Sequence, residues 1–167
     1  MTPPSELIVR DATSADYERI NEIYNWTIID NHVSFDTEPW DLARRAEWAA
    51  ARGDDLHCLV GELDGEVVGV TYSSNYRPKP AYRSSKETTI VLDTAHLGRG
   101  FGSVLLSALL ARLRSVDAHR AVAIIALPND GSVALHLKLG YTIVGTLTDA
   151  GMKRGTFYDT MLLERPI

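Results

Sequence analysis

The sequence predicts a single α/β domain built on a mixed β-sheet, and three observations support this prediction. Apolar residues at helical spacing alternate with short β-rich runs along the chain. Asp64-Gly65 joins two such runs, and this dipeptide is favoured in the tight turn of a β-hairpin. The length of 167 residues is that of one ordinary domain, so we assign residues 1–167 to one unit.

The first half of the chain is predicted to form one strand, two helices and a hairpin. The β-rich run ELIVR predicts a strand over residues 6–10. Apolar side chains at mostly helical spacing predict a helix over 16–30. A second helix over 40–52 has a proline just outside its start and a glycine just past its end. The hairpin strands cover 57–63 and 66–76.

The second half alternates strands with helices and ends in two strands. ETTIVLD predicts a strand over 87–93, and a leucine-rich helix follows a glycine-rich stretch and extends to the region of Ser115. A buried strand is expected over 121–127, and a short helix over 132–139 ends at a glycine. Two final strands, separated by a glycine-punctuated loop, cover 141–147 and 156–164. This order of elements favours helices packed on a sheet of mixed strand direction.

Composition and charge restrict the partners of the chain. Hydrophobic residues make up 45% and charged residues 23%, and no apolar run reaches the roughly 20 residues that a membrane helix needs. A net charge of −5 gives no overall basic surface for nucleic acid. We therefore expect small-molecule partners, no membrane span and no nucleic-acid ligand.

The single cysteine and the N-terminal residues both suit a reducing compartment. Cys58 cannot form an internal disulfide, and its apolar neighbours predict a buried, unreactive thiol. The N-terminal residues do not combine a basic end with an apolar stretch, so we expect no secretory signal. These features favour a cytoplasmic location.

Three glycines on alternate positions, Gly98, Gly100 and Gly102, lie between a predicted strand and a predicted helix. Amides at a helix start lack intrahelical partners, and glycine lets a ligand approach them closely. The positive helix end favours an anion such as a pyrophosphate, to which Arg99 would add a charge. The alternative is a flexible connection. A Rossmann fingerprint would follow the first strand and a P-loop needs Gly-Lys-Ser/Thr, so neither fits.

Motifs along nearly the whole chain resemble one enzyme family. The loop at residues 97–102 and Asn129, near the start of the next helix, resemble the acyl-CoA site of the GNAT acetyltransferase superfamily. The phosphinothricin acetyltransferase-like branch of that superfamily is matched by IYNWTI, VSFDTEPW, NYRPKPAYR, KETTIVL, ALHLKLGY and GMKRGTFYD. The resemblance implies the GNAT acyl-CoA N-acyltransferase fold, with three α/β/α layers around the mixed sheet.

The resemblance also implies a binding site for acetyl-CoA, the cosubstrate, between two neighbouring strands. The backbone of Thr89, Ile90 and Val91 is expected to contact the pantetheine arm, and Asn129 to make a polar contact. The implied pyrophosphate cradle consists of Leu97, Gly98, Arg99, Gly100, Phe101 and Gly102. Two positions depart from the family: Leu97 replaces the usual Arg or Gln, and Val91 replaces a common tyrosine.

Two residues are candidates for proton transfer. An amine must lose a proton before it attacks a thioester, and Glu87 matches the family's Glu-x-Ser/Thr pattern. The alternative for Glu87 is a hydrated carboxylate at a strand end. His136 follows Asn129 by seven residues, where many GNAT enzymes carry a tyrosine that protonates the departing thiolate. A histidine there can act as acid or base, or can simply be packed. The five histidines show no metal-ligand motif, so we expect no metal.

A cationic and aromatic segment precedes Glu87 and is expected to contact the acceptor. The expected acceptor residues are Tyr76, Arg77, Pro78, Arg83, Lys86, Glu87 and Thr88. An arginine fork can bind a carboxylate or phosphinate, whereas most surface cations stay hydrated. By resemblance, Phe35 lines the acceptor pocket, the alternative being core packing. Lys153 and Tyr158 fit a terminal segment that closes the site or forms a dimer contact.

These features predict an acetyl-CoA-dependent N-acetyltransferase acting on the α-amino group of a small amino acid or analogue. Phosphinothricin, methionine sulfoximine and methionine sulfone are the acceptors that the resemblance suggests. One alternative is a GNAT enzyme for an aminoglycoside, a polyamine or a protein amino terminus. A second is a non-catalytic acyl-CoA-binding sensor, which would keep the glycine loop without needing Glu87. The resemblance is also compatible with a homodimer.

Overall fold

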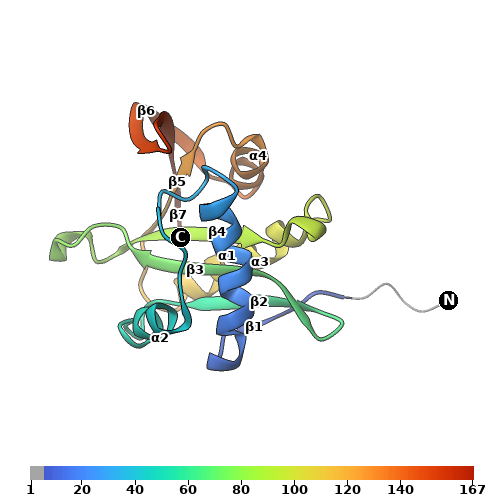
Figure 1. The fold of residues 1–167 in the computed structure, drawn as a ribbon. Coiled ribbons are helices and arrows are strands. Elements are labelled where there is room, and N and C mark those ends of the chain that lie inside the picture. Colours follow the sequence, from blue (N-terminus) through green and yellow to red (C-terminus); the bar gives the residue numbers. More distant parts are fainter. Residues whose placement is uncertain (1–5) are drawn as a thin grey trace.

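One seven-stranded sheet forms the middle layer of the structure, a computed structural model that describes residues 6–167 (Figure 1). The strands are β1 (Ile8–Asp11), β2 (Cys58–Leu63), β3 (Glu66–Asn75), β4 (Ser85–Leu92), β5 (Arg120–Ala126), β6 (Thr142–Lys153) and β7 (Thr156–Pro166). They lie in the order β1-β2-β3-β4-β5-β7-β6. Only β4 and β5 pair in parallel within this part of the chain.

Helices cover both faces of the sheet. They are α1 (Tyr17–Ile29), α2 (Leu42–Ala50), α3 (Phe101–Arg114) and α4 (Asp130–Lys138), with short 3-10 helices at Ser14–Asp16, Pro80–Tyr82 and Thr94–His96. Because α1 and α2 pack on one face and α3 and α4 on the other, the predicted α/β/α layers are confirmed. The predicted hairpin turn is also present, with positive φ at Asp64 (53°) and Gly65 (86°).

The C-terminal hairpin differs from its prediction. The sequence predicts a loop between the last two strands, but β6 continues as far as the two-residue turn Arg154-Gly155. The register of β6 against β7 shifts between Leu147 and Gly151. The turn-like residues therefore form an irregularity inside a strand, because pairing on both sides of it overrides their local preference.

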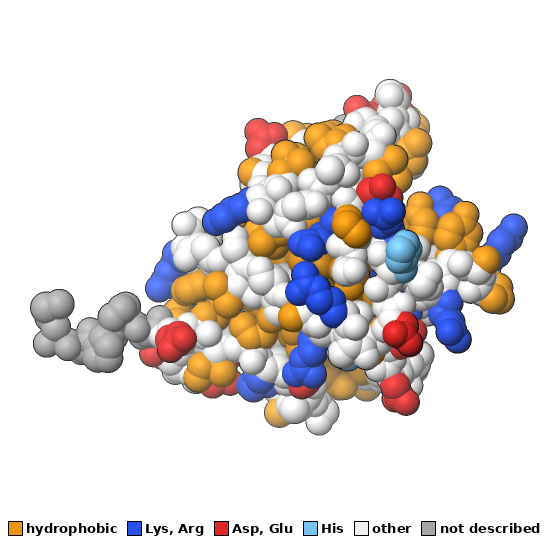
Figure 2. Space-filling view, turned by 180° about the vertical axis from the view of Figure 1, so that it is seen from behind, with side chains coloured by type: hydrophobic (Ala, Val, Ile, Leu, Met, Phe, Trp, Pro, Cys, Tyr) orange, Lys and Arg blue, Asp and Glu red, His pale blue; other side chains and the backbone are white. Residues whose placement is uncertain are grey.

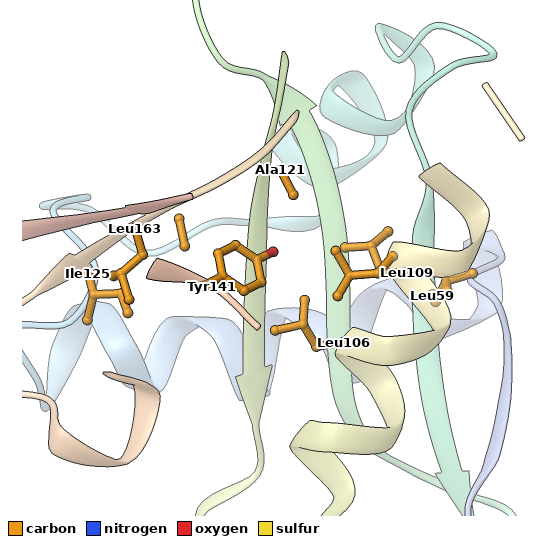
Figure 3. Packing of buried hydrophobic residues seen from close by; sticks show 9 residues of the cluster. Leu59, Leu106, Leu109, Ala121, Ile125, Tyr141 and Leu163 are labelled. Carbon is orange, nitrogen blue, oxygen red and sulfur yellow. The ribbon is translucent and has the colours of Figure 1, made fainter. Parts of the chain in front are cut away.

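Each face of the sheet has its own apolar core. Leu106 and Leu109 project from α3 toward the strands, with Tyr141 beside them (Figure 3). On the opposite face, Ile20 and Ile23 of α1 pack against the side chains of β2 and β3. Full burial of each such leucine or isoleucine stabilises the fold by about 1.5–3 kcal/mol. The two cores hold the helices on either side of the central strands.

α2 is attached through a buried arginine instead of an apolar stripe. Arg45 is only 1% exposed, and its guanidinium carbon lies 4.3 Å from the centre of Trp40 and 5.0 Å from that of Trp48. Its Nε donates to Oδ1 of Asn21 at 2.8 Å. Cation–π contacts and this hydrogen bond offset part of the cost of burying the charge. They hold α2 against α1, next to the loop that connects the two helices.

Gly69 of β3 tests the packing of α3 on the sheet. A Cβ at this position would lie 2.5 Å from Cδ2 of Leu92 and 2.9 Å from Cδ1 of Leu105. We expect Gly69→Ala to lower the free energy of unfolding by about 1–3 kcal/mol, because an overpacked core must shift. Urea denaturation measures the change. Gly145→Ala is the control, since a Cβ there meets no atom within 4 Å. Equal stability of the two variants would contradict this close packing.

Candidate functional site

β4 and β5 run side by side for three residues and then separate. Residues 85–87 pair with residues 120–122, and no later pair between these strands occurs in the described chain. Thr88 donates from Oγ1 to the carbonyl of Val122 at 3.2 Å and shares a 2.8 Å hydrogen bond with the hydroxyl of Tyr141. Burial raises the pKa of Tyr141 to about 12, so its hydroxyl stays neutral. These side chains define the inner end of a gap between the strands.

The expected cofactor residues of β4 lie along this gap. Thr89, Ile90 and Val91 follow the last residue that pairs with β5. Ile90 packs against the core below α3, and Val91 packs against the core on the opposite face. The carbonyl of Thr89 accepts a 2.8 Å hydrogen bond from Oγ1 of Thr71, whereas the backbone groups of this segment that point toward β5 are left to a ligand, since no strand ladder uses them in the described chain. This arrangement suits an extended chain that contains amides, such as pantetheine.

The glycine loop offers a run of unused backbone amides. Between Gly98 and Gly102, no amide donates to a protein acceptor within the part of the chain that the structure describes. Gly98 and Gly100 have φ values of 74° and 83°, which glycine adopts without strain. Gly100 is also the N-cap of α3 and brings no capping side chain. The amides and the positive helix end together favour a phosphate group.

The surroundings of the glycine loop leave its amides accessible. Gly102 lies in the first turn of α3, where a Cβ would come within 3.1 Å of Cδ2 of Leu135 in α4. Leu97 is 55% exposed and supplies no charge, as expected for this departure from the family pattern. Arg99 is exposed, with its guanidinium carbon 4.8 Å from the centre of the Phe101 ring. Arg99 is thus the cationic side chain at this loop.

Asn129 begins α4, which packs beside the start of α3. Its Oδ1 accepts a 3.2 Å hydrogen bond from the amide of Ser132, so its carbonyl caps the helix. Its Nδ2 has no acceptor among the described residues and can donate to a ligand. The sequence predicts a polar contact from Asn129, and this side-chain orientation is compatible with one.

His136 is buried in α4 with a defined tautomer. The ring is 2% exposed, and Nδ1 lies 2.7 Å from the carbonyl oxygen of Ser132. A carbonyl only accepts, so Nδ1 carries the proton and Nε2 is left as an acceptor, without a partner among residues 6–167. Burial lowers the pKa of His136, which keeps the ring neutral at pH 7. This tautomer favours accepting a proton at Nε2 over donating one.

Glu87 is the carboxylate next to the point where the strands separate. It is half-buried, and its side chain has no hydrogen-bond or ion-pair partner within residues 6–167. Burial raises the pKa of Glu87, since no cation or donor compensates for the lost water. Glu87 alternates with Thr88 and so faces the α1 and α2 side of the sheet. A half-buried, unpaired carboxylate with a raised pKa fits a general base.

The two sequence neighbours of Glu87, Lys86 and Thr88, already have hydrogen-bond partners within the protein. The sequence places Lys86 in the cationic loop, but Lys86 lies in β4 and is only 1% exposed. Its Nζ lies 2.5 Å from Asp55 and 2.9 Å from Asn75, so its charge is already paired. The prediction that Lys86 lies in the loop before the Glu87 strand is wrong, because Lys86 is part of β4, where alternation turns its side chain toward the opposite face from Glu87. The side chain of Thr88 points to the same face as that of Lys86 and makes the hydrogen bonds at the inner end of the gap between β4 and β5.

The rest of the cationic segment forms an exposed loop. Residues 76–84 project from the sheet at the left of Figure 1, and Figure 2 shows Lys and Arg side chains on the corresponding right-hand projection. Arg77 stacks on Tyr76, 5.1 Å from its ring centre. Neither Arg77 nor Arg83 has an acidic partner within ion-pair distance in the described chain. Arg77 lies in the loop two residues past Asn75, the end of β3, next to the Ser74–Glu87 pair.

Phe35 lies in the loop between α1 and α2 and contacts the far end of β6. A Cβ on Gly151 would lie 2.2 Å from Cε2 of Phe35, so the ring covers this glycine. Phe35 is 39% exposed and therefore lines a surface instead of the core. Lys153 is buried beneath the same loop, and Tyr158 stacks on His32. Tyr141 was not predicted as a site residue, because its only local signal in the sequence is a hydroxyl in an apolar position.

The helices within residues 6–167 are all too short or too polar to span a membrane. No group of three or more His, Cys, Asp or Glu residues is arranged there to hold a metal ion. Cys58 is a free thiol, and burial raises its pKa to about 11, which agrees with the predicted unreactive thiol.

Comparisons with known proteins point to one family. The family described as acetyltransferase (GNAT) matches residues 20–141. The chain is 36% identical to the phosphinothricin N-acetyltransferase of Streptomyces coelicolor over 100% of both chains. It is 32% identical to the L-methionine sulfoximine/L-methionine sulfone acetyltransferase of Pseudomonas aeruginosa, over 93% of this chain and 92% of that relative.

A solved structure extends the likeness to the fold. The phosphinothricin acetyltransferase of Sinorhizobium meliloti, crystallised in complex with AcCoA, has a TM-score of 0.92 and 31% identity to this chain. The match covers 96% of this chain and 88% of that one.

Gly100 tests the glycine loop as a phosphate cradle. A Cβ at Gly100 meets no protein atom within 4 Å, so an added methyl group would clash only with a ligand, and the backbone strain from the positive φ of 83° is shared by the control variant. We expect Gly100→Ala to stay folded and to bind acetyl-CoA about tenfold or more weakly, because it blocks close approach to the amides. Calorimetric titration measures the affinity. Gly65→Ala is a matched control, since Gly65 also has positive φ and open space but lies in the remote hairpin turn. Unchanged affinity in folded Gly100→Ala would reject the cradle.

Proposed function

The chain belongs to the acetyltransferase (GNAT) family, and on that premise we propose that it acetylates the α-amino group of a small amino acid or amino-acid analogue. The observation that carries this proposal is Glu87, an unpaired and half-buried carboxylate beside the gap between β4 and β5. The names of the relatives suggest phosphinothricin, methionine sulfoximine and methionine sulfone as acceptors.

The residues along the gap fit acetyl-CoA as the cosubstrate. The amides between Gly98 and Gly102 suit its pyrophosphate, and the backbone of Thr89–Val91 suits its pantetheine arm. Nδ2 of Asn129 supplies a further donor. When bound, acetyl-CoA supplies the electrophilic thioester carbonyl. Backbone amides along the gap would stabilise the negative charge that develops on the thioester carbonyl oxygen.

Glu87 is assigned as the general base. A typical amino group is mostly protonated at pH 7 and cannot attack until it loses a proton. Glu87 accepts that proton directly or through a water molecule, and its raised pKa makes it a stronger base than an ordinary glutamate. His136 is the second candidate for proton transfer, in the accepting direction that its tautomer allows. Donation to the departing sulfur would require the imidazolium form, which burial disfavours.

Arg77 and Arg83 are proposed to hold the carboxylate of the acceptor. Both are exposed arginines without an acidic partner in the described chain, on the loop that leads into the strand of Glu87. A guanidinium can bind a carboxylate through two parallel hydrogen bonds. Tyr76 and Pro78 lie on the same loop, and Phe35 would contribute the opposite, apolar wall. A polyamine acceptor would favour acidic groups here, so this loop argues against it.

A second copy of the chain is proposed to cover the C-terminal hairpin. β6 is an edge strand whose apolar side chains are largely exposed: Ile143, Val144, Leu147 and Met152, together with Phe157 of β7. Monomeric proteins seldom leave so many large apolar side chains together on a sheet edge. A homodimer would cover them.

The proposed function is tested by incubating the protein with acetyl-CoA and separate acceptors while following release of the CoA thiol. Amino-acid analogues, aminoglycosides, polyamines and peptides with free amino termini form the acceptor set. We expect turnover with the amino-acid analogues. Turnover only with another class of amine would show that the enzyme acts on that class and not on amino-acid analogues. Binding of acetyl-CoA without turnover of any amine would favour a sensor.

Glu87→Gln tests the general base. We expect turnover to fall by about 100-fold or more, while acetyl-CoA affinity stays within twofold, because the amide cannot accept the proton. In the wild type, kcat/KM should fall as the pH decreases through a pKa above the ordinary 4.5 of glutamate, since protonated Glu87 is inactive. Comparison of the pH profiles of the wild type and Glu87→Gln separates the ionisation of Glu87 from that of the acceptor amine. The exposed Glu18→Gln serves as control, and near-normal turnover of Glu87→Gln across pH 6 to 9 would exclude Glu87 as the base.

Arg77→Ala and Arg83→Ala test the carboxylate contact. We expect the wild type to use free L-amino acid analogues about tenfold or more better than their amides, which lack the carboxylate charge. The variant that loses the contact should have a lower kcat/KM for the free acid and an unchanged kcat/KM for the amide. Its preference for the acid should therefore be smaller than that of the wild type. The measurement is kcat/KM for each acid and amide pair, with the exposed Arg114→Ala as control. Equal use of acids and amides by the wild type would refute the clamp.

A further inference from the structure

The loop between α1 and α2 is held by a lysine that lies more than a hundred residues later in the chain. Nζ of Lys153 donates to the carbonyls of Thr27 at 3.2 Å, Asn31 at 2.8 Å and Ser34 at 2.7 Å. An ammonium group has three donors, so all of them are used. Lys153 is 5% exposed, and within residues 6–167 it has no carboxylate within ion-pair distance. Its charge is therefore stabilised by backbone carbonyls of this loop and of the last turn of α1.

The contact between Lys153 and Thr27 is favourable because it lies at the C-terminal end of α1. Thr27 lies in the last turn of α1, whose C-terminal carbonyls carry a partial negative charge. A buried ammonium without hydrogen bonds would be strongly unfavourable, so Lys153 and the three carbonyls constrain one another. Burial also lowers the pKa of Lys153, with the nearby Arg154 acting in the same direction. The conformation of residues 27–34 is thus tied to the end of β6.

Other contacts join the same hairpin to the same loop. The ring of Tyr158 stacks on His32, with ring centres 4.6 Å apart and an interplanar angle of 8°. Nη2 of Arg154 donates to the carbonyl of Ile28 at 3.0 Å. Nε2 of His32 lies 3.0 Å from the carbonyl of Pro128, the residue before the N-cap of α4. Lys153 provides the buried centre of this set, which otherwise consists of partly exposed groups.

The held loop lies on the same face of the sheet as Glu87. Residues paired across strands share a face, and Glu87 pairs with Val122, which pairs with Glu164 of β7. Alternation along β7 then puts Tyr158 on this face as well. Tyr158 pairs with Gly151, against which the ring of Phe35 packs. Phe35 therefore stands on the Glu87 side of the sheet, opposite to the face covered by α3 and α4.

We propose that Lys153 is a positioning residue for the acceptor amine: it fixes residues 27–34, and through them Phe35, over the Glu87 face of the sheet. Acceptor recognition then depends on Lys153, whereas binding of acetyl-CoA at the glycine loop does not. This inference rests on the proposed function and adds the element that shapes the acceptor side of the site.

Lys153→Met is the direct test, because it keeps the length of the side chain and removes all three donors. We expect the KM for the acceptor to rise about tenfold or more, while the KM for acetyl-CoA stays within twofold. Lys153→Arg, which keeps a charge and donors, should recover part of the loss. Lys138→Met, at an exposed lysine of α4, is the matched control and should behave as the wild type. A folded Lys153→Met with an unchanged acceptor KM, or with both KM values raised equally, would overturn the proposal.

Gly151→Ala gives a second route that leaves the lysine intact. The added Cβ would lie 2.2 Å from the ring of Phe35, so the ring must move, and the same selective rise in acceptor KM is expected. Amide hydrogen exchange adds a readout that needs no turnover: residues 30–37 should exchange faster in Lys153→Met than in Lys138→Met. If the wild type acetylates no amine, the proposed function fails and this exchange comparison still decides the role of Lys153. Equal exchange in the two variants would show that Lys153 does not hold the loop.

Discussion

The separation of β4 from β5 leaves a gap where a parallel ladder would otherwise continue, and the site depends on it. Buried backbone groups need hydrogen-bond partners, so strands can separate inside a sheet only where other groups replace the lost bonds. Thr88 supplies such a bond to the carbonyl of Val122, and Tyr141 completes the small network. Beyond this point, the facing backbone of β4 is left for a ligand.

Alternation along β4 assigns different tasks to adjacent side chains. Lys86 and Thr88 point to one face, where Asp55, Asn75 and Tyr141 satisfy them. Glu87 points to the other face and stays unpaired in the described chain, with its pKa raised. A carboxylate that serves as a general base works better without a cationic partner, because a salt bridge would lower its pKa and make it a weaker base. The glycine loop begins α3, on the opposite face of the sheet from Glu87.

Buried cations hold separate segments of the fold together. Lys86 pairs with Asp55, Arg45 lies among aromatic rings, and Lys153 binds three backbone carbonyls. Burying a charge is costly unless nearby groups compensate for the lost water, so each cation fixes the segments that supply its partners. Lys153 and Lys86 are therefore paired with groups of the protein and do not face a ligand. Exposed cations remain on the loop of Arg77 and Arg83.

The sequence by itself determined the elements whose signals lie within a few neighbouring residues. The hairpin at Asp64-Gly65 and the glycine loop before α3 each follow from local backbone preferences. Their order also sufficed to predict a mixed sheet with helices, and the motif resemblance supplied the three-layer fold.

Only the tertiary structure decided which polar side chains stay available and where the strands part. The burial of Lys86, the tautomer of His136, the network at Thr88 and the continuation of β6 past its turn-like residues depend on packing partners. The lysine that holds the α1–α2 loop lies more than 110 residues from its acceptors, with separations of 119 to 126 residues. Burial and hydrogen-bond partners arise from segments brought together by the fold, so no local pattern encodes them.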